Sequence, residues 1–361
     1  MSLEIISFED VDSLKEAWDE VVNNTQHAWF WSTYQEHQYR LSTLKASGVL
    51  IKDSTFLLVD NNIFYGLAPL VFIRSSVFDG IQASYDKPLP WPMIVDTVND
   101  PEKVYSFIFD EIERLIIEFN VEMLSVEYSP PYLNEKDLSI YLSTIRKRKF
   151  INNSYQSHFI NVTPLVLNNV RKRYRRYVNK YIDKYELSII DSHSHYSTLP
   201  LEYMGLHVKD SGATYRPLKT YENQLKCLNY GKGFIVQAKS RDHDKVVGML
   251  LINVFKGAAY DSSVAVDPDF QSDQISNLLK WKAIKYLQKL NIKHYDLGKA
   301  AIVPNYLWQP TEKNYGISFF KNGWSRDCYK RVWQSDKFFS KEALSSYCDN
   351  KREDIINYLA L

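Results

Sequence analysis

The chain has 361 residues, about twice the length of an ordinary domain, so two domains are expected. Apolar residues make up 45% of it and charged residues 24%, as in a soluble globular protein, and the net charge of +1 excludes a strong overall field that would by itself bind nucleic acid or an anionic membrane. The three cysteines, Cys227, Cys328 and Cys348, are too few and too far apart for a disulfide framework, which favours a reducing compartment.

Two segments bear on the location of the protein. The first 16 residues, MSLEIISFEDVDSLKE, are acidic and lack the apolar core of a signal peptide. A long apolar run, VVGMLLINVF (Val246–Phe255), falls far short of the roughly 20 residues that a membrane-spanning helix needs. A cytoplasmic protein is therefore expected.

The first half of the chain alternates strand and helix signals. A capping box at residues 13–16 and the turn residues 60–62 punctuate it, and Asp100-Pro101 begins a helix. The predicted elements are a helix at 13–22, strands at 55–60 and 65–73, a proline-rich loop at 86–93, a helix at 101–119 and a strand at 123–128.

The second half repeats that order. Its predicted elements are strands at 233–239, 246–255 and 258–266, an amphipathic helix at about 274–290 with Asp273 as its N-cap, and a strand at 293–298. In each half a strand starts around a glycine, Gly66 and then Gly248, and a long helix precedes a short strand. The repeated plan predicts a duplicated α+β domain, with domains at 1–150 and 151–335 and a tail at 336–361.

A strongly basic segment lies between the halves. Val170, Tyr174, Tyr177 and Tyr181 fall at helical spacing, and the remaining positions carry Arg171, Lys172, Arg173, Arg175, Arg176 and Lys180. Such a helix face is either simply solvated or a surface that binds phosphate groups. The sequence leaves both interpretations open.

The segment NYGISFFKNGW (Asn314–Trp324) places one lysine, Lys321, behind two phenylalanines and before an Asn-Gly turn signal. The pattern predicts a strand in which Lys321 shares a face with Phe319 and the turn follows. Lys321 is then either a solvated charge at a strand end or a cation held at the rim of a site.

These features together resemble a known family. The two-domain plan, the basic helix, the strand YDLG (Tyr295–Gly298), the segment GISFFKNGW and the N-terminal FWSTYQEHQYR (Phe30–Arg40) are similar to the Fem-type (FemAB-like) aminoacyl- and acyltransferases. These belong to the GNAT acetyltransferase superfamily and consist of two GNAT-like domains in tandem. The resemblance covers nearly the whole chain and rests on the order and spacing of individually weak motifs. It implies mixed central sheets flanked by helices, with the tail packing back on the first domain.

The resemblance also implies a role for Lys321. In the family, the lysine that follows a phenylalanine in this segment lies at the acyl-transfer site, near the donor's phosphate or the developing oxyanion, and Lys321 matches it. Phe320 precedes it and is assigned to substrate binding. Acyl transfer to an amine passes through a tetrahedral oxyanion that a fixed cation stabilises, so the chemistry agrees.

Two further residues are candidates for catalysis. The attacking amine must lose a proton, and Asp296 in YDLG offers a carboxylate at a strand end, although it is equally a turn or cap residue. Tyr260 in AAYDSS lies on the strand that lines the acyl channel in GNAT-like folds, although it is equally a core residue.

The sequence departs from an ordinary acetyl-CoA-binding GNAT at one place. Such proteins carry a glycine-rich turn before the long helix, whose backbone N–H groups hold a pyrophosphate. Here the turn reads QSDQIS (Gln271–Ser276) and has no glycine. The histidines form no convincing metal-ligand spacing, and no permanent cofactor or metal is predicted.

The function predicted from these features is N-acyl transfer from acyl-CoA or aminoacyl-tRNA to an amino group of a nucleotide-linked sugar or cell-envelope precursor. Tyr34 and Trp91 of the aromatic first half, with Arg171, Arg173, Arg175 and Arg176, are assigned to an acceptor that has a ring and a diphosphate. The alternative is a non-catalytic Fem-like protein that recognises an envelope precursor or a partner. The sequence leaves the donor, the acceptor and the oligomeric state open.

Overall fold

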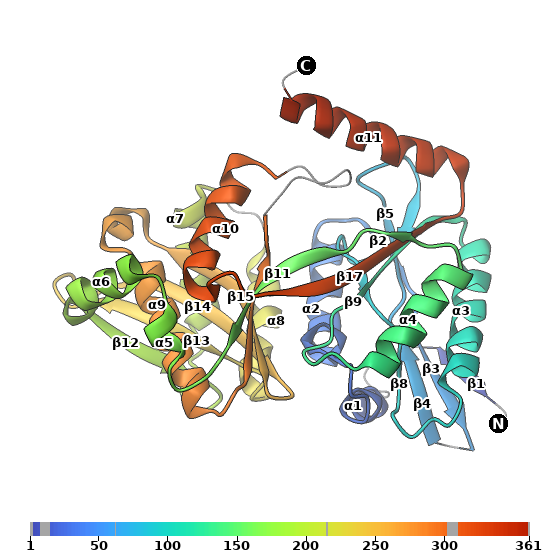
Figure 1. The fold of residues 1–361 in the computed structure, drawn as a ribbon, viewed down its shortest axis with the longest axis horizontal. Coiled ribbons are helices and arrows are strands. Elements are labelled where there is room, and N and C mark those ends of the chain that lie inside the picture. The colour runs from blue at the N-terminus through green and yellow to red at the C-terminus, as the bar shows by residue number, and fades with distance from the viewer. Residues whose placement is uncertain (1–2, 8–14, 62, 214–215, 302–309, 360–361) are drawn as a thin grey trace. The chain divides into compact units, whose positions relative to one another are not determined.

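The computed structural model describes residues 3–7, 15–61, 63–213, 216–301 and 310–359, without the side chains of 354–359. The chain divides into two compact units (Figure 1). The first contains Met1–Tyr155, Val303–Pro310 and Arg331–Leu361, and the second contains Gln156–Ile302 and Thr311–Lys330. The sequence of the second unit is therefore inserted into that of the first.

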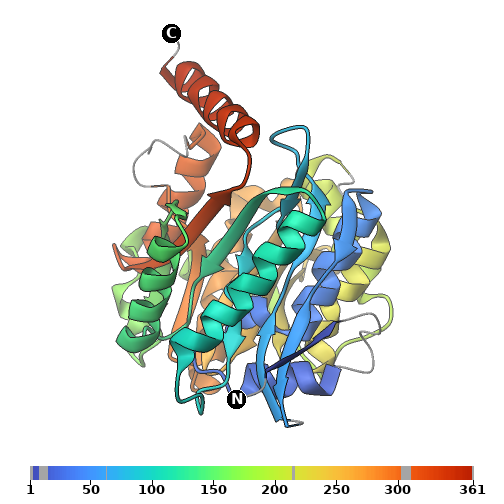
Figure 2. The same cartoon turned by 90° about the vertical axis from the view of Figure 1, so that its right-hand side faces the viewer.

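The first unit contains two sheets. One has the strand order β1-β3-β4-β8, and the other has the order β17-β9-β6-β5-β2, with β10 on β17 and β7 on β9. Figure 2, which looks onto this unit, shows α3 (teal) lying over its strands. The elements are β1 (Glu4–Ser7), α1 (Lys15–Asn23), η1 (Phe30–Ser32), α2 (Tyr34–Ala46), β2 (Leu50–Asp53), β3 (Phe56–Asp60), β4 (Ile63–Ala68), β5 (Val71–Arg74), β6 (Ile81–Ala83), β7 (Leu89–Pro90), β8 (Met93–Ile94), α3 (Pro101–Glu118), β9 (Val121–Tyr128), α4 (Glu135–Lys147), β10 (Ile151–Asn152), β17 (Tyr329–Phe338) and α11 (Lys341–Leu359).

Two elements predicted for the first unit, the capping box at 13–16 and the strand at 65–73, are not seen as expected. The capping box at 13–16 lies partly outside the described residues, so only the helix that follows it is seen. The single strand expected at 65–73 is two strands, because Pro69 has no N–H for a ladder, and the chain passes there from β4 in one sheet to β5 in the other.

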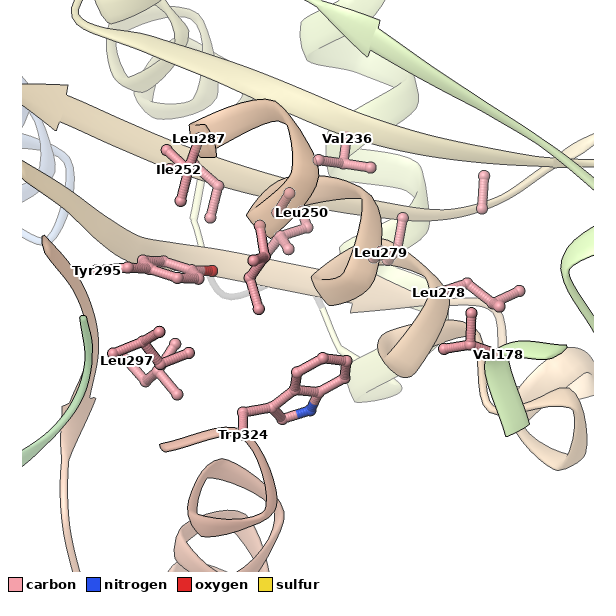
Figure 3. Close-up of a cluster of buried hydrophobic side chains, with 14 of the residues drawn as sticks. Val178, Val236, Leu250, Ile252, Leu278, Leu279, Leu287, Tyr295, Leu297 and Trp324 are labelled. Atoms are coloured by element: carbon pink, nitrogen blue, oxygen red, sulfur yellow. The ribbon is translucent and has the colours of Figure 1, made fainter. Parts of the chain in front are cut away.

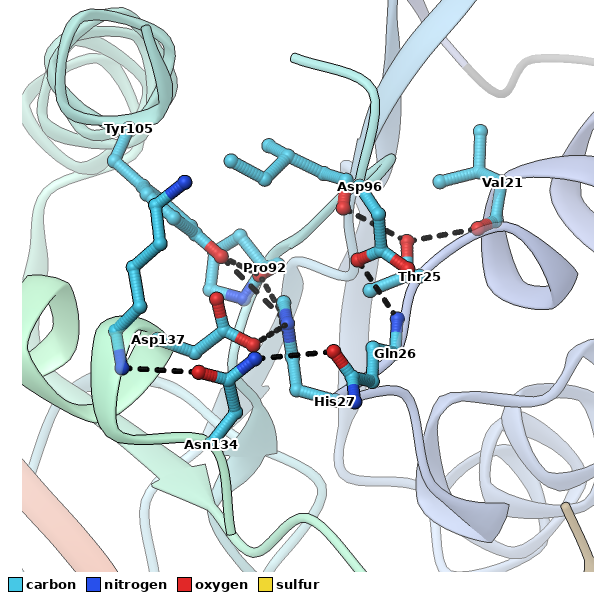
Figure 4. Close-up of polar contacts among 11 residues, drawn as sticks. Val21, Thr25, Gln26, His27, Pro92, Asp96, Tyr105, Asn134 and Asp137 are labelled. Atoms are coloured by element: carbon cyan, nitrogen blue, oxygen red, sulfur yellow. Dashed lines mark hydrogen bonds and ion pairs between the residues drawn. The ribbon is translucent and has the colours of Figure 1, made fainter. Parts of the chain in front are cut away.

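A polar network fixes the connection after α1 (Figure 4). The Thr25 hydroxyl is 2.8 Å from the Val21 carbonyl at the end of α1 and 2.9 Å from the Ile94 carbonyl in β8. The Gln26 N–H donates to the Asp96 carboxylate at 2.9 Å. Thr25 is fully buried, so these bonds satisfy groups that would otherwise be costly to remove from water.

The C-terminal segment belongs to the first unit from Arg331 on. β17 pairs antiparallel with β9, with Trp333 opposite Tyr128. In α11, the Tyr347 ring lies 5.1 Å from the Phe338 ring. These contacts explain why residues 331–335, expected in the second domain, lie in the first unit.

The second unit contains one mixed sheet with the order β12-β13-β14-β15-β16-β11. Only the β15–β16 pair is parallel among its described ladders. The elements are β11 (Tyr155–Asn161), α5 (Val166–Asn169), α6 (Lys172–Tyr181), η2 (Ile182–Lys184), β12 (Tyr185–Ile190), α7 (Leu199–Ser211), α8 (Leu218–Asn229), β13 (Gly233–Ser240), β14 (Val246–Phe255), β15 (Ala258–Val266), η3 (Pro268–Asp273), α9 (Ile275–Lys289), β16 (His294–Lys299) and α10 (Glu312–Ser325).

Hydrophobic cores lie on both faces of this sheet. Leu250 and Ile252 of β14 join the core of α6, α9 and α10, whereas Met249 and Leu251 join the core of α7 and α8. The alternation follows from the two-residue period of a strand. Figure 3 shows the first of these cores, with Trp324 of α10 directed toward the α9 side chains.

Both units are therefore α+β, with mixed sheets flanked by helices, as the sequence predicts. No helix in the described part of the chain is both long enough and apolar enough to cross a bilayer.

Candidate active site

A pocket of about 500 Å³ lies in the second unit, where the pairing of two strands ends. β15 and β16 pair in parallel only as far as Tyr260 opposite Asp296. β15 continues to Val266, and its residues beyond this point line the pocket together with the starts of η3 and α9 and one face of α10. The lining residues are Asp210, Leu250, Asp261, Val264, Val266, Pro268, Gln271, Gln274, Ile275, Ser276, Asn277, Lys280, Gly316, Ile317, Phe320 and Lys321.

A β-bulge determines which side chains of β15 face the pocket. Asp261 lies opposite Ile252 and Ser263 lies opposite Leu251, so Ser262 is the extra residue. The bulge places Asp261 and Val264 on the same face of the sheet as α9, although they are three positions apart. In a regular strand, two residues three positions apart would lie on opposite faces.

The segment that contains Lys321 is a helix, which corrects the strand prediction. α10 begins with a capping box between Thr311 and Asn314 and continues through the Asn322-Gly323 pair without a turn. Phe319 and Lys321 therefore do not share a face. The pocket receives Gly316, Ile317, Phe320 and Lys321, which is helical spacing, whereas the side chain of Phe319 is 65% exposed.

Close packing explains why a glycine-containing segment becomes a helix. A Cβ atom on Gly323 would lie 2.0 Å from the buried Tyr174 ring, so only glycine lets α10 approach α6 this closely. The Arg171 N–H donates to the Gly323 carbonyl at 2.9 Å. Trp324 is buried in the same contact. Tertiary burial therefore overrides the weak helix propensity of two glycines.

The ammonium of Lys321 is a cation without a direct partner. Among the described residues it makes no hydrogen bond or ion pair, and burial lowers the pKa of Lys321 below its ordinary value, although Asp261 and Asp296 oppose this shift. A Cβ atom on Gly298 would lie 3.1 Å from its Nζ and 3.5 Å from the Tyr260 hydroxyl. Gly298 has a φ of +87°, which favours glycine, so the backbone leaves space beside both groups.

A second lysine lines the same pocket and is paired. Lys280 of α9 is only 4% exposed, and its Nζ contacts the Asp261 carboxylate and lies 3.0 Å from the Tyr295 hydroxyl. Burial lowers the pKa of Lys280, and the attraction of Asp261 opposes that shift. A buried charge of this kind needs a close partner, and Asp261 provides it.

The carboxylate of Asp296 is already engaged on both oxygens. Oδ1 accepts hydrogen bonds from Ser157 Oγ at 2.5 Å and from the Gly298 N–H at 2.8 Å. Oδ2 lies 2.9 Å from Lys330 Nζ. These bonds hold the Gly298 turn in place, so the arrangement favours a structural contribution of Asp296 beside its predicted role in proton transfer.

A buried histidine connects α10 to β11. His158 Nε2 lies 2.7 Å from Ser318 Oγ, and Nδ1 lies 3.1 Å from Ser325 Oγ. Burial, reinforced by the charge of Lys321, lowers the pKa of His158 to about 4. The imidazole is therefore neutral near pH 7 and anchors the helix that carries Lys321.

The start of α9 differs from the prediction. Gln274, with a φ of +60°, occupies the N-cap position, and the expected N-cap Asp273 instead accepts a hydrogen bond from Tyr185 at 2.7 Å and pairs with Lys184 at 3.6 Å. The 3-10 turn before α9 explains the change, because it carries Asp273 away from the first N–H groups of the helix. Gln274 and the first turn of α9 border the pocket.

The basic run forms α6 but lies outside this pocket. None of Arg171, Arg173, Arg175 and Arg176 lines it. The Arg171 guanidinium lies 4.1 Å from the centroid of the Phe319 ring on α10, and Arg173 is exposed and bonded to Tyr177. Arg176 is also exposed. This placement favours a solvated face for Arg173 and Arg176, and phosphate binding by this helix stays a prediction.

Tyr34 and Trp91, the aromatic residues assigned to the acceptor, lie in the core of the first unit. Trp91 is 3% exposed, with the Phe109 ring at 4.9 Å and the Tyr141 ring at 4.7 Å. Tyr34 is 7% exposed and packs edge-on against Trp18. A substrate would have to displace packed neighbours to reach either ring, so the structure favours a packing role.

The sequence prediction missed Asp261 and Lys280. Lys280 precedes Ala283 and Ile284 by three and four residues, so it lies on the apolar face of a predicted helix, where a lysine is unusual. Asp261 directly follows Tyr260 and is the one charged residue in the predicted strand AAYDSSVAV (Ala258–Val266). Within the described residues, no group of three or more histidine, cysteine, aspartate and glutamate side chains is arranged to hold a metal ion.

Several solved structures of other proteins have a similar fold over nearly the whole chain. No protein-family model and no curated protein matches the sequence. The structure of FemX superposes with a TM-score of 0.65 at 12% identity, over 93% of this chain and 97% of that one. The C-terminal domain (DUF2156) of a putative lysylphosphatidylglycerol synthetase from Agrobacterium fabrum gives 0.58 at 11% identity, over 94% and 96%.

A third structure, L-PGS from Bacillus licheniformis, gives a TM-score of 0.53 at 10% identity, over 90% of this chain and 95% of that one. All three cover nearly the full length of both chains, so the likeness extends over both units. The chain has the Fem-type fold of two GNAT-like units, as the resemblance in the sequence predicts.

Proposed function

We propose that the protein is an N-acyltransferase and that Lys321 stabilises the oxyanion formed during transfer. The observation that carries this proposal is the half-buried ammonium of Lys321, which lines a pocket and has no direct partner among the described residues. An unpaired cation is costly to bury, so its position favours an anionic occupant. The fold shared with FemX supports transferase chemistry as the context.

In the proposed reaction, the neutral amine of the acceptor attacks the carbonyl carbon of an ester or thioester donor. The carbonyl oxygen becomes an oxyanion, and the Lys321 ammonium stabilises it in a site of low dielectric constant. The C–O or C–S bond to the donor then breaks, and the leaving oxygen or sulfur takes up the proton that the attacking nitrogen loses. Tyr260, whose hydroxyl shares the space beside Gly298 with Lys321, is proposed to donate a hydrogen bond to the reacting groups.

The donor is proposed to be acyl-CoA or aminoacyl-tRNA, and the acceptor an amino group of a nucleotide-linked sugar or cell-envelope precursor. Both donors carry phosphates, which suit the first turn of α9 and Lys321, both of which line the pocket. The pocket also contains the Asp261 carboxylate, whose charge Lys280 offsets.

The direct test is mass spectrometry of candidate amino-sugar acceptors incubated with acyl-CoA or with charged tRNA. The expected result is a mass increase that equals the acyl or aminoacyl group, with a dependence on only one class of donor. Binding of acceptors without transfer from either class of donor would instead support the non-catalytic alternative.

A further inference from the structure

Two lysines, Lys280 and Lys321, and two aspartates, Asp210 and Asp261, line the pocket. Asp261 acts electrostatically on Lys321, whereas the charge that acts on Asp210 is that of Lys313. Asp296 also lies near Lys321, but Ser157, Gly298 and Lys330 hold it. Asp261 therefore has two possible cationic partners, and the structure pairs it directly with Lys280. The choice of partner decides whether Lys321 has a free positive charge.

Lys280 is held in place from two sides. Its stem lies on the buried face of α9, where Leu279 and Ala283 are fully buried, and the fully buried Tyr295 contacts its ammonium from β16. The bulge at Ser262 turns Asp261 toward this ammonium. Lys280 is much less exposed than Lys321, so a bound molecule reaches Lys321 more readily.

We propose that Lys280 is a positioning residue, which holds the Asp261 carboxylate so that Lys321 stays unpaired and open to an anionic group of the donor. This deepens the proposed function and rests on it for the role of Lys321. If Lys280 loses its charge, the closest available cation for Asp261 is Lys321, and an internal ion pair then competes with the ligand.

The test measures the reactivity of Lys321 in the full-length protein without substrate. Each lysine is acetylated with a limiting amount of acetic anhydride at one pH, and mass spectrometry gives the extent at each position. In Lys280→Met, Lys321 is expected to pair with Asp261, which favours its protonated form, and only the neutral amine reacts with the anhydride. We therefore expect acetylation of Lys321 to fall about fivefold or more, which corresponds to a rise of somewhat less than one unit in its pKa.

The double variant Lys280→Met/Asp261→Asn separates this proposal from a merely structural effect. It removes both charges, so Lys321 is expected to regain reactivity to within about twofold of the wild type. A role of Lys280 in packing alone predicts that the double variant stays as altered as the single one. Lys289→Met removes an exposed charge from the same helix and is the matched control, with no expected change.

Two results would overturn the proposal: unchanged acetylation of Lys321 in Lys280→Met, or no recovery in the double variant. If Lys280→Met does not fold, Lys280→Gln keeps a polar group beside Asp261 and Tyr295 and must still slow the acetylation. Failure of the proposed function is seen separately, because it would appear as full transfer activity without Lys321, whatever the acetylation pattern.

Discussion

At the scale of single residues, the site depends on which lysine pairs with which carboxylate. Three lysines, Lys280, Lys321 and Lys330, lie near two carboxylates, and each carboxylate is directly paired with a lysine other than Lys321. The sequence predicts Lys321 as the functional cation, through the resemblance of the SFFKNGW segment. The sequence does not predict that Lys321 is unpaired. That state depends on Lys280 and Asp261, which approach each other only after the sheet and α9 have packed.

The Lys321→Ala variant tests the main catalytic assignment. We expect turnover to fall by about two orders of magnitude or more, which is the scale of loss when one oxyanion donor is removed. Lys321→Arg is expected to restore activity only in part, because the guanidinium is longer and planar. Initial rates of transfer measure both effects.

The control for this prediction is Lys313→Ala, an exposed lysine on the same helix, which should keep wild-type rates. Thermal unfolding of Lys321→Ala should change little or even improve, because the substitution removes a charge whose burial is unfavourable. Full activity of Lys321→Ala in an assay in which the wild type turns over would refute the catalytic role.

The lowered pKa of the buried His158 is expected to make the stability of the protein depend on pH. The pKa of His158 is lowered to about 4 in the folded state, from an ordinary value of about 6.5. The unfolded chain therefore binds the proton first as the pH falls, and stability that is present above pH 6.5 is lost toward pH 4. We expect this residue to remove about 2 kcal/mol of unfolding free energy between pH 7 and pH 5.

Denaturant unfolding of the wild type and of His158→Gln at both pH values measures this contribution. The variant is less stable at pH 7, because it loses hydrogen bonds to Ser318 and Ser325, but its stability should fall less steeply with pH. Equal slopes for the two proteins would show that His158 does not titrate as its burial requires.

At the scale of elements, the sequence predicts α3, α9 and the strands β3, β9 and β13 to β16, but it misses the shorter strands of the first unit and assigns α10 wrongly. The predicted strands had clear apolar patterns and turn residues at their ends, as in β13 and β14. In α10, the local sequence resembles a strand that ends in a turn, because Phe319 and Phe320 precede Asn322-Gly323. Gly316, Phe320 and Trp324 have helical spacing, but the reason for this spacing is their packing against α6, which the sequence does not show. The local pattern was ambiguous and tertiary packing decided it.

A pair of glycine substitutions tests this account of α10. Gly323→Ala places a methyl group against the buried Tyr174 ring, so we expect a loss of about 1–3 kcal/mol of unfolding free energy from overpacking. Gly316→Ala in the same helix meets no atom within 4 Å and should stabilise the protein by up to about 1 kcal/mol.

Chemical denaturation of both variants gives the two values, with Gly316→Ala as the matched control. If α10 were held only by its own propensity, both substitutions would stabilise it. A crystal structure of Gly323→Ala should show a shift of Tyr174 or of α10, and unchanged positions of both would contradict the packing argument.

At the scale of the whole molecule, the two units resemble each other in plan but differ in how the chain completes them. The second unit is formed largely from one continuous stretch, whereas the first recruits β17 and α11 from the end of the chain. β17 pairs with β9, and Ala343 and Tyr347 of α11 form a small core with Phe78 and Met123. Sequence periodicity indicates such elements but not their partners, because pairing over some 200 residues leaves no local signal.

The contribution of α11 is measured by Tyr347→Ala. This side chain is 9% exposed, contacts Phe338 and bonds Asn153, so we expect a loss of about 2–4 kcal/mol of local stability. Hydrogen exchange should accelerate at the amides of β9 and β17 more than at those of β13 and β14. Tyr230→Ala, which truncates an exposed tyrosine, is the control, and equal acceleration in both sets of strands would contradict the assignment of α11 to the first unit.

The late position of β17 has a consequence for a chain that is still on the ribosome. Translation produces the whole of the second unit before residues 331–338, so β9 waits without its antiparallel neighbour while about 200 later residues are made. An unpaired strand edge readily joins other extended chains. A nascent chain released before residue 331 therefore carries a finished second unit and an open edge in the first, and this edge is where chaperones or aggregation would act.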